Sequence, residues 1–427
     1  MKHIVLFGAG KSATVLIDYL KDTATKKQWL VSIADINLSA IQAKLGNHSL
    51  VTAVELSIDD KEKRAALIAS ADVVISLMPP SLHLIVAMDC LLLGKHLLTA
   101  SYVDDKLRLL AEEIKSKDLL FLSEMGLDPG IDHMSAMQLI HRIKKLGGKI
   151  ISFKSHCGGL VAPESDNNPW HYKFSWNPRN VINAGKAGAI FKEKGTIQNT
   201  PYEELYANCA EVFVEGLGQL AYYPNRDSLS YISLYGLEET GTFIRTTLRY
   251  PAFCSGWKTM IDLGLTDEAT AVNTEGLSTA AFWKHAFAEK NIHLGTELLK
   301  QQFDYLGLHE ETLINKGVCS KADILQWILE KKWALNENDK DMIVMLHQID
   351  YVVEGKCATV NSSLVVKGED VLRTAMAKTV GLPLGIAATL LLEGKIISRG
   401  LRIPDFEELY QPVLQELESY GIAFRDS

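Results

Sequence analysis

The chain has 427 residues, which is too long for a single hydrophobic core and suggests two or three domains. Its formal net charge of −8 argues against a nucleic-acid or anionic-membrane partner, because either would favour basic surface patches. The hydrophobic content of 47% is that of an ordinary soluble globular protein.

The first 125 residues alternate apolar, strand-like runs with helical patterns. Residues 4–7 form the first run, and apolar residues then recur at three- and four-residue spacing from Lys11 onward. A second strand is expected at 29–34, ending at Asp35. Further strands are expected at 50–54, 73–77, 96–99 and 119–122, with helices at 82–93 and 104–115. Buried strands that alternate with helices predict an α/β fold with a doubly wound parallel sheet of Rossmann type.

A glycine-containing loop follows the first expected strand. Its Gly10-Lys11-Ser12 is typical of a P-loop, but that motif needs an earlier glycine at position 5, which is Val5 in the strand. The dinucleotide pattern G-x-G-x-x-G/A fits instead, since it allows a tight turn, a close approach to the pyrophosphate and close helix–strand packing. The expected phosphate-binding residues are Gly8, Gly10, Lys11, Ser12 and Ala13.

Asp35 lies at the end of the second expected strand, where it bears on the choice of cofactor. A carboxylate there accepts hydrogen bonds from the adenosine ribose hydroxyls and repels a 2′-phosphate. The next residues, Ile36, Asn37 and Leu38, supply no arginine or lysine for that phosphate. The sequence therefore favours NAD over NADP, and a solvated turn aspartate is the alternative interpretation.

Residues 124–133 predict a turn followed by a helix, which ends at Gly147-Gly148. Asp128 therefore follows a strand of the nucleotide sheet, at the carboxyl edge where ligands of such sheets bind. Asp128-Pro129-Gly130 is equally typical of an ordinary turn, so the local sequence leaves both interpretations open.

Two further stretches bear on ligand binding. Residues 155–179 are rich in aromatic side chains without clear periodicity, and we expect a functional lid or binding loop there. Residues 241–250 predict a strand whose alternation places Arg245, Thr247 and Arg249 on one face. That face is either the solvent side of a sheet or a guanidinium-lined pocket for carboxylates.

The remaining patterns complete a two-domain prediction. Residues 267–337 are mostly helical, 342–353 return to strand character, and 374–427 are helical. We expect a Rossmann-type NAD(P)-binding domain from residues 1–125 and about 385–427. We expect an α+β substrate-binding and dimerisation domain at 126–384, with a helical insertion at about 265–337.

The six cysteines are scattered, with no C-x-x-C and no Cys/His pair at zinc spacing. Reduced thiols and no metal site are therefore expected. The N-terminus has too few apolar residues for a signal peptide. The longest apolar run, 380–392, contains Pro383 and Gly385 and is expected to fall short of a membrane span. A soluble cytoplasmic protein is expected.

Several blocks of the sequence resemble the saccharopine dehydrogenase family of the glutamate-forming kind (saccharopine reductase). The blocks are ASY at 100–102, GLDPGIDHM at 126–134, CGGLVAPESDNNPWHYKFSW at 157–176, NRDS at 225–228 and TLRY at 247–250. The resemblance covers essentially the whole chain. It departs at Val161, where relatives carry proline.

The resemblance implies NAD(P)-dependent oxidation of the secondary amine of saccharopine. The resulting imine is hydrolysed to glutamate and 2-aminoadipate 6-semialdehyde, in lysine metabolism. By similarity, the substrate-binding residues are Ser101, Tyr102, Asp128, Arg226, Thr247, Leu248 and Arg249. The nicotinamide side of the cofactor site is lined by Leu77, Met78, Ala100, Leu127, Pro129 and, more weakly, Trp176. The resemblance also implies a homodimer.

The residues agree with this chemistry, because saccharopine carries three carboxylates that arginines bind well. Imine hydrolysis needs proton transfers, for which Asp128, Tyr102, His156 and Cys157 are candidates. We favour Asp128 with Tyr102 assisting, although the substrate amine or bound water could carry the protons. Cys157 could act as a nucleophile, but a structural thiol is the simpler interpretation.

Two alternatives stay open. One is a related imine-reducing enzyme such as carboxynorspermidine dehydrogenase, which would share the fold but need fewer arginines. The other is a non-catalytic NAD-binding Rossmann protein, which would have an occluded or unpolarised substrate cleft. Arg226, Arg249 and the Cys157-Gly158-Gly159 block favour saccharopine.

Overall fold

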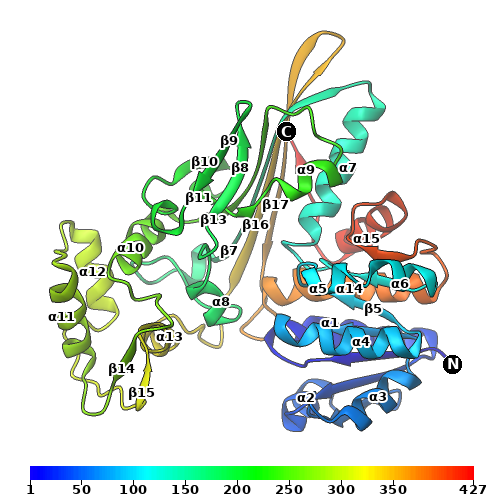
Figure 1. The fold of residues 1–427 in the computed structure, drawn as a ribbon, viewed down its shortest axis with the longest axis horizontal. Helices are drawn as coiled ribbons and strands as arrows, with labels where there is room; N and C mark the ends of the chain where they lie inside the picture. The colour runs from blue at the N-terminus through cyan, green and yellow to red at the C-terminus, as the bar shows by residue number, and fades with distance from the viewer. The chain divides into compact units, whose positions relative to one another are not determined.

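The computed structural model describes all 427 residues, which form two compact units (Figure 1). The first unit comprises Met1–Lys149 with Leu372–Arg425, and the second comprises Ile150–Val371 with Asp426–Ser427. These boundaries differ from the expected ones, because α7 (Ile131–Lys145) belongs to the first unit. This helix packs against α15 (Glu407–Ser419), where His141 Nδ1 lies 2.8 Å from the Tyr410 hydroxyl.

The first unit is built on a seven-stranded sheet with the strand order β18-β6-β5-β4-β1-β2-β3. All of its neighbouring strands run parallel. The strands are β1 (His3–Phe7), β2 (Leu30–Asp35), β3 (Val51–Glu55), β4 (Val73–Ser76), β5 (His96–Thr99), β6 (Leu120–Leu122) and β18 (Gly400–Arg402). This order confirms the Rossmann-type sheet. Its strand order reverses between β1 and β4, which is where such sheets bind their ligands.

The C-terminal part of the chain differs from the expected all-helical tail. β18 (Gly400–Arg402) adds a parallel strand beside β6, with Leu401 in register with Phe121. A three-residue strand leaves no alternating pattern in the sequence, so periodicity alone does not reveal it.

Helices accompany this sheet in the expected positions, with one interruption. They are α1 (Thr14–Lys27), α2 (Leu38–Leu45), α3 (Lys61–Ser70), α4 (His83–Leu93), α5 (Asp105–Arg108), α6 (Ala111–Ser116), α7, α14 (Ala375–Leu392) and α15. The single helix expected at 104–115 is divided into α5 and α6 at Leu109 and Leu110.

Helix α14 lies within the stretch expected to be helical, and it continues without a break through Pro383 and Gly385. Its 18 residues are long and apolar enough to cross a membrane, but 78% of that segment is buried within the structure. It packs closely on α1, since a Cβ at Gly381 would lie 3.0 Å from the Leu16 side chain. A Cβ at Gly385 would lie 2.5 Å from the Tyr19 ring. The helix therefore forms the core of the first unit.

The second unit is built on a ten-stranded mixed sheet with the main order β10-β11-β13-β7-β16-β17-β19. Its strands are β7 (Lys149–Val161), β8 (Ala189–Glu193), β9 (Thr196–Thr200), β10 (Ala210–Val214), β11 (Gly218–Pro224), β12 (Arg226–Asp227), β13 (Thr242–Arg249), β16 (Asp341–Val353), β17 (Lys356–Lys367) and β19 (Arg425–Asp426). The strands expected at 241–250 and 342–353 are thus present as β13 and β16.

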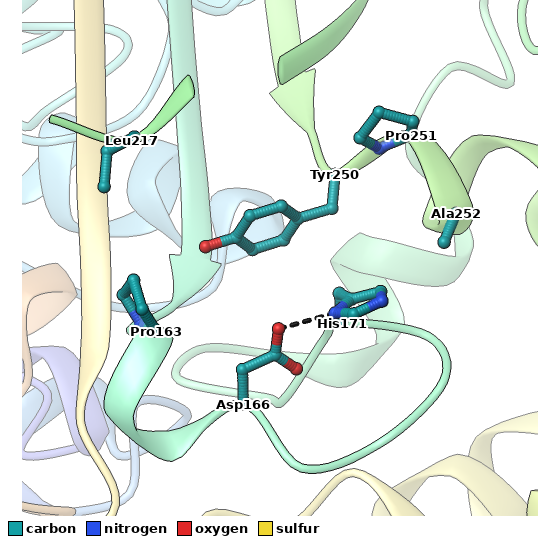
Figure 2. Close-up of a pocket in the computed structure, with 7 residues that line it drawn as sticks. All are labelled: Pro163, Asp166, His171, Leu217, Tyr250, Pro251 and Ala252. Atoms are coloured by element: carbon teal, nitrogen blue, oxygen red, sulfur yellow. Dashed lines mark hydrogen bonds and ion pairs between the residues drawn. The ribbon is translucent and has the colours of Figure 1, made fainter. Parts of the chain in front are cut away.

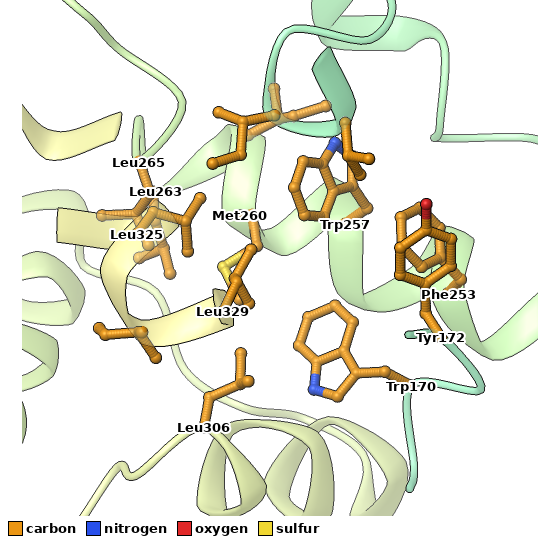
Figure 3. Close-up of a cluster of buried hydrophobic side chains, with 14 of the residues drawn as sticks. Trp170, Tyr172, Phe253, Trp257, Met260, Leu263, Leu265, Leu306, Leu325 and Leu329 are labelled. Carbon is orange, nitrogen blue, oxygen red and sulfur yellow. The ribbon is translucent and has the colours of Figure 1, made fainter. Parts of the chain in front are cut away.

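Part of the aromatic stretch at 155–179, expected to be a lid or a binding loop, is instead built into the core; a role in binding stays a prediction. Its first seven residues continue β7, and the rings of Trp170, Tyr172 and Phe174 are buried in a core cluster. Figure 3 shows Trp170 and Tyr172 in this cluster with Trp257 and Phe253. Aromatic side chains that alternate irregularly along a loop can still supply core packing, which periodicity does not predict.

The helical segments of the second unit are α8 (Pro178–Ile182), α9 (Ser230–Leu234), α10 (Pro251–Asp262), α11 (Thr279–Lys290), α12 (Glu297–Tyr305) and α13 (Lys321–Lys332). Two short strands, β14 (Ala271–Asn273) and β15 (Val318–Ser320), pair beside them. The mostly helical character expected at 267–337 is present as α11, α12 and α13.

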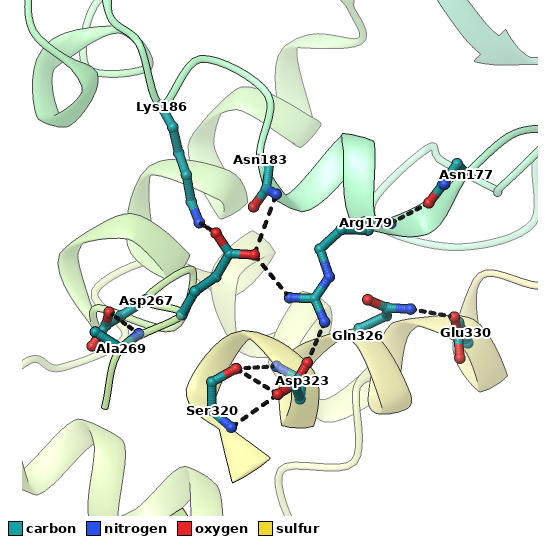
Figure 4. A network of polar contacts seen from close by, with 11 residues as sticks. Asn177, Arg179, Asn183, Lys186, Asp267, Ala269, Ser320, Asp323, Gln326 and Glu330 are labelled. Carbon is teal, nitrogen blue, oxygen red and sulfur yellow. Dashed lines mark hydrogen bonds and ion pairs between the residues drawn. The ribbon is translucent and has the colours of Figure 1, made fainter. Parts of the chain in front are cut away.

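A polar network ties α8 to this helical segment (Figure 4). Arg179 forms ion pairs with Asp323 of α13 and with Glu268, and Lys186 Nζ lies 3.0 Å from Glu268 Oε2. Asp323 and Ser320 also cap the start of α13 reciprocally. Hydrogen bonds from Ser320, together with Arg179, lower the pKa of Asp323 to about 2.

Candidate functional site

The loop after β1 has the form of a phosphate cradle. Gly8 has φ +98°, and a Cβ there would lie 2.9 Å from the Leu77 carbonyl group, so glycine is required. At Gly10 a Cβ would meet nothing within 4 Å, so the backbone of the loop is open on that side. A short helical turn, Lys11–Ala13, leads into α1. No side chain caps the start of this turn or the start of α1. The first N–H groups of such a helix are available to a pyrophosphate, which the loop therefore fits.

Asp35 lies beside this loop at the end of β2. Its Oδ2 accepts a hydrogen bond from Ala9 N at 2.7 Å, and its Oδ1 accepts one from Asn37 N at 3.0 Å. Lys44 of α2, which the sequence analysis missed, donates from Nζ to Ala9 O at 2.5 Å and Gly10 O at 2.6 Å. Burial lowers the pKa of Lys44, while the negative charge of Asp35 opposes that shift. The carboxylate of Asp35 and the ammonium group of Lys44 therefore both bind backbone groups of the loop and fix its position.

The residues expected on the nicotinamide side fall into two groups. Leu77 and Met78 follow β4, Ala100 follows β5, and Leu127 and Pro129 are buried after β6. These five residues follow strands at the carboxyl edge of the first unit's sheet, the ligand edge of such folds. Trp176 belongs to the second unit, where its Nε1 donates to the Tyr172 hydroxyl at 3.2 Å. Cofactor binding by these residues stays a prediction.

Tyr102 and Asp128 meet at the same edge of the first unit. The Tyr102 hydroxyl donates to Asp128 Oδ1 at 3.3 Å, although 26 positions separate them. Asp128 sits in a tight turn, because a Cβ at the following Gly130 would lie 2.0 Å from Gly126 O. The two residues preferred for proton transfer from the sequence are therefore in contact, and the turn around Asp128 has a defined shape.

A histidine that the sequence analysis missed supports Ser101. His83 of α4 places Nε2 2.8 Å from Ser101 Oγ and Nδ1 2.8 Å from Ser76 Oγ. Burial lowers the pKa of His83 to about 4, so its ring is uncharged at neutral pH. The ring thus links the ends of β4 and β5 through neutral hydrogen bonds. Position 83 opens a helix of otherwise apolar character, and no local sequence pattern marks it.

In the second unit, β7 and β13 run parallel and bring two predicted site residues into register. Cys157 lies opposite Thr247, and Thr247 also lies opposite Tyr223 of β11. Residues in register on neighbouring strands point to the same face, and residues two apart on one strand share it. Cys157, Thr247, Tyr223 and Arg249 therefore occupy one face of the sheet.

Arg249 is the most distinctive group on this face, because it is buried without a carboxylate. It is 4% exposed, and its guanidinium donates from Nη1 to Leu248 O at 2.8 Å. The group lies 5.5 Å from the Tyr172 ring centre and 5.3 Å from that of Phe253. Its Nε has no hydrogen-bond partner within the protein. Buried guanidinium groups normally pair with an anion, so this one has unused capacity to bind a carboxylate.

His156, a candidate for proton transfer from the sequence, lies on the other face of the sheet. His156 lies opposite Thr246, with Nδ1 2.7 Å from Thr246 Oγ1, and is fully buried. Burial lowers its pKa to about 3. An uncharged ring on the face away from Cys157 does not serve the proton transfers for which the sequence made it a candidate. Leu248 also points to this face, where its side chain is part of a hydrophobic cluster. Only its backbone is available to a ligand.

The remaining arginines differ in environment. Arg245 is 3% exposed and lies 4.5 Å above the Tyr231 ring. Arg226 is exposed and has φ +47°, on the short strand β12 that pairs with β8. Of the two alternatives left open for this face of β13, the solvent-facing side is excluded, because Arg245 and Arg249 are both buried.

A cavity of about 420 Å³ lies next to Tyr250 in the second unit (Figure 2). Asp166 and His171 face each other on its wall, with Oδ2 2.5 Å from Nδ1. The Tyr250 hydroxyl donates to Val161 O at 3.3 Å. The cavity is lined by Pro163, Asp166, His171, Leu217, Tyr250, Pro251 and Ala252.

Comparison with known proteins adds to this geometry. Residues 4–122 match the model of the saccharopine dehydrogenase NADP binding domain, and residues 126–422 match that of the saccharopine dehydrogenase C-terminal domain. The chain is 33% identical over 446 residues to saccharopine dehydrogenase [NADP(+), L-glutamate-forming] from Saccharomyces cerevisiae, covering 100% of this chain and 99% of that protein. It is 36% identical to alpha-aminoadipic semialdehyde synthase from Arabidopsis thaliana, covering 98% of this chain but 44% of that protein.

A solved structure extends the similarity to three dimensions. The apo histidine-tagged saccharopine dehydrogenase (L-Glu forming) from Saccharomyces cerevisiae superposes with a TM-score of 0.90 at 31% identity. The match covers 100% of this chain and 99% of the other.

Proposed function

The chain belongs to the saccharopine dehydrogenase family, and we propose that it is an NAD(P)-dependent saccharopine dehydrogenase of the glutamate-forming kind. The reaction oxidises the C–N bond at the secondary amine of saccharopine to an imine. Water then cleaves the imine to glutamate and 2-aminoadipate 6-semialdehyde. The reaction is reversible and belongs to lysine metabolism.

One observation carries the choice of substrate: the buried guanidinium of Arg249 has no carboxylate partner within the protein. A tricarboxylate substrate supplies the missing anion, and a charge-assisted contact in a buried site is strong. The diamine substrate of a carboxynorspermidine dehydrogenase would leave more of these arginines without a carboxylate partner. Thr247 and the exposed Arg226 complete the proposed carboxylate-binding set, with Leu248 contributing only backbone groups.

A nicotinamide cofactor, when bound, would supply the hydride acceptor, so the protein's own residues must position the substrate and move protons. We assign proton transfer at the substrate nitrogen to Asp128, assisted by the hydroxyl of Tyr102, which lies 3.3 Å from its Oδ1. Ser101, held by His83, is assigned to a substrate carboxylate. Cys157 shares the face of Arg249 and is assigned to contact with the substrate rather than to nucleophilic attack.

The proposed cofactor is NAD in preference to NADP. Asp35 places a carboxylate beside the loop where the adenosine ribose binds, and a 2′-phosphate there would be repelled. Lys44 interacts electrostatically with that carboxylate, but two loop carbonyl groups already occupy its amino group. The matching family model and the yeast relative both carry NADP in their names, so the preference needs a direct measurement.

We further propose a cytoplasmic homodimer that binds neither nucleic acid nor membranes. The net charge of −8 supports the absence of nucleic-acid and anionic-membrane partners, because it provides no electrostatic attraction for polyanions. Light scattering on the eluting chromatographic peak would measure the mass, and a monomer of 47.3 kDa would contradict the dimer.

The experiment that tests the function follows reduced dinucleotide at 340 nm with saccharopine and either NAD or NADP. Turnover with saccharopine, and none with carboxynorspermidine, is expected. Turnover only with the second compound would contradict the assignment of substrate.

A further inference from the structure

A buried carboxylate, Glu124, contacts the loop that carries Tyr102, the hydrogen-bond partner of Asp128. Glu124 is 1% exposed and follows β6 in the first unit. Its backbone has φ +60°, a left-handed conformation that residues with a side chain rarely adopt. Such a conformation persists where surrounding contacts hold it, and it is common at functional sites.

Glu124 forms hydrogen bonds with the residue before Tyr102 and with the residue after it. Glu124 N donates to Ser101 O at 3.0 Å, and Glu124 Oε1 accepts from Val103 N at 3.1 Å. Both peptide neighbours of Tyr102 are therefore bound to one residue. These two hydrogen bonds fix the backbone from which the phenol ring reaches Asp128.

The second carboxylate oxygen of Glu124 is held by a histidine. His133 of α7 is fully buried, and its Nε2 lies 2.8 Å from Glu124 Oε2. An ionised carboxylate only accepts, so the imidazole donates in this contact. The neighbouring Asp132 lies 3.7 Å from His133 Nδ1, and its Oδ1 accepts from Gly130 N at 2.6 Å. The same network thus also reaches the turn that carries Asp128.

We propose that Glu124 and His133 are positioning residues for the reaction, which hold Tyr102 in contact with Asp128. Glu124 fixes the loop at 101–103, and His133 fixes the carboxylate of Glu124 against the helix that follows the Asp128 turn. Neither residue is assigned contact with the substrate or the cofactor. This inference rests on the proposed function, since it presupposes that Tyr102 and Asp128 act in the reaction.

The kinetic test is a double-mutant cycle with saccharopine as the substrate. Glu124→Gln keeps the length of the side chain but replaces one acceptor oxygen with a donor. It is expected to lower kcat by roughly tenfold to a hundredfold with the dinucleotide Kd nearly unchanged. In the Tyr102→Phe background the same change is expected to cost less than about threefold, because the two residues act together. Equal losses in both backgrounds would contradict a role through Tyr102.

A control separates positioning from loss of stability. Asp89→Asn removes the charge from a buried ion pair elsewhere in the same unit, in which Arg64 Nε lies 2.7 Å from Asp89 Oδ2. It is expected to lower the melting temperature and leave kcat unchanged. If Asp89→Asn lowered kcat as much as Glu124→Gln does, the effect would be structural and the proposal would fail.

If Glu124→Gln does not fold, two variants of His133 carry the test. His133→Gln can donate the same hydrogen bond to Glu124, whereas His133→Phe cannot. Recovery of kcat in the Gln variant relative to the Phe variant supports the proposal, and equal activities contradict it.

A readout that needs no turnover separates this inference from the proposed function. Hydrogen–deuterium exchange of a peptide covering residues 101–108 is expected to be faster in Glu124→Gln than in the unmodified protein. Unchanged exchange there would overturn the positioning role. Failure of the unmodified protein to oxidise saccharopine, with faster exchange in the variant, would instead contradict only the proposed function.

Discussion

The hydroxyl of Tyr102 donates to Oδ1 of Asp128 at 3.3 Å, which joins the loop after β5 to the turn after β6. Removing the hydroxyl in Tyr102→Phe is expected to lower kcat for saccharopine by roughly a hundredfold to ten-thousandfold, as for other groups that take part in proton transfer. The Kd for the dinucleotide should stay within about twofold. Steady-state kinetics and fluorescence titration measure these quantities, and an unchanged kcat would remove Tyr102 from the mechanism.

Arg249→Ala is expected to raise the KM for saccharopine, because it removes a buried charge-assisted contact to a carboxylate. A contact of this kind contributes about 1.5–3 kcal/mol, which corresponds to roughly ten- to a hundredfold in affinity. Arg179→Ala is a matched control, since Arg179 pairs with Asp323 and Glu268 on α13 and the neighbouring loop. Its KM should not change. Equal weakening of saccharopine and dinucleotide binding in Arg249→Ala would count against a carboxylate site.

Asp35→Ser is expected to shift the enzyme toward NADP by removing a negative charge beside the 2′ position. The ratio of kcat/KM for NAD to that for NADP should fall by about tenfold or more. Asp35 also accepts from Ala9 N at 2.7 Å, so a parallel loss with both dinucleotides would show a structural role instead. An unmodified protein that already prefers NADP would contradict the assignment of Asp35.

Acid is expected to destabilise the protein through two histidines, the partly buried His83 and the fully buried His156. Burial lowers the pKa of His83 to about 4 and that of His156 to about 3, from the ordinary value of 6.5. In that interval the unfolded chain binds more protons, so the free energy of unfolding falls as the pH decreases from about 6.5 toward 4. Protonation of His83 lowers the free energy of unfolding by at most about 3 kcal/mol over this pH interval, at about 1.4 kcal/mol per unit of pKa shift.

Urea unfolding at several pH values measures this slope. His83→Gln should flatten it, whereas the same change at exposed His309, whose side chain is 83% exposed, should not. Parallel slopes for His83→Gln and the unmodified protein would contradict the lowered pKa of His83.

Gly158→Ala is expected to destabilise the second unit. A Cβ at position 158 would lie 2.6 Å from Leu248 O, so the strand that carries Arg249 would have to shift. Overpacking of this kind costs about 1–3 kcal/mol. Gly241→Ala is the control, because its Cβ would meet Ile151 O at an ordinary 3.5 Å. Similar melting temperatures for the two variants would contradict the close approach.

The nucleotide-binding half was predictable from the sequence because its signals are local. A four-residue apolar strand, Gly8, Gly10 and Ala13 specify the turn, and the alternation of strands with helices specifies the parallel sheet. Short elements such as β18 escaped prediction, since three residues carry no period. The buried aromatic rings of Trp170 and Tyr172 escaped for a related reason, because loop residues that pack into a core follow no repeat.

The candidate site was predictable in its residue types but not in its supporting contacts. Asp128 and the arginines were accessible through their sequence blocks, yet Glu124, His83 and Lys44 were not. Each of these acts through a partner far along the chain, as Lys44 does with Ala9 and Gly10. Pairings of this kind depend on how strands and loops meet, which periodicity and motifs do not encode. The burial of His156 on the opposite face likewise depends on the register of β7 with β13.

The most direct measurement of the central claim is the stoichiometry of products formed from saccharopine in the presence of NAD or NADP. Equal amounts of reduced dinucleotide and glutamate are expected, with NAD the better oxidant. No reduced dinucleotide with either oxidant, or reduction without release of glutamate, would contradict this claim.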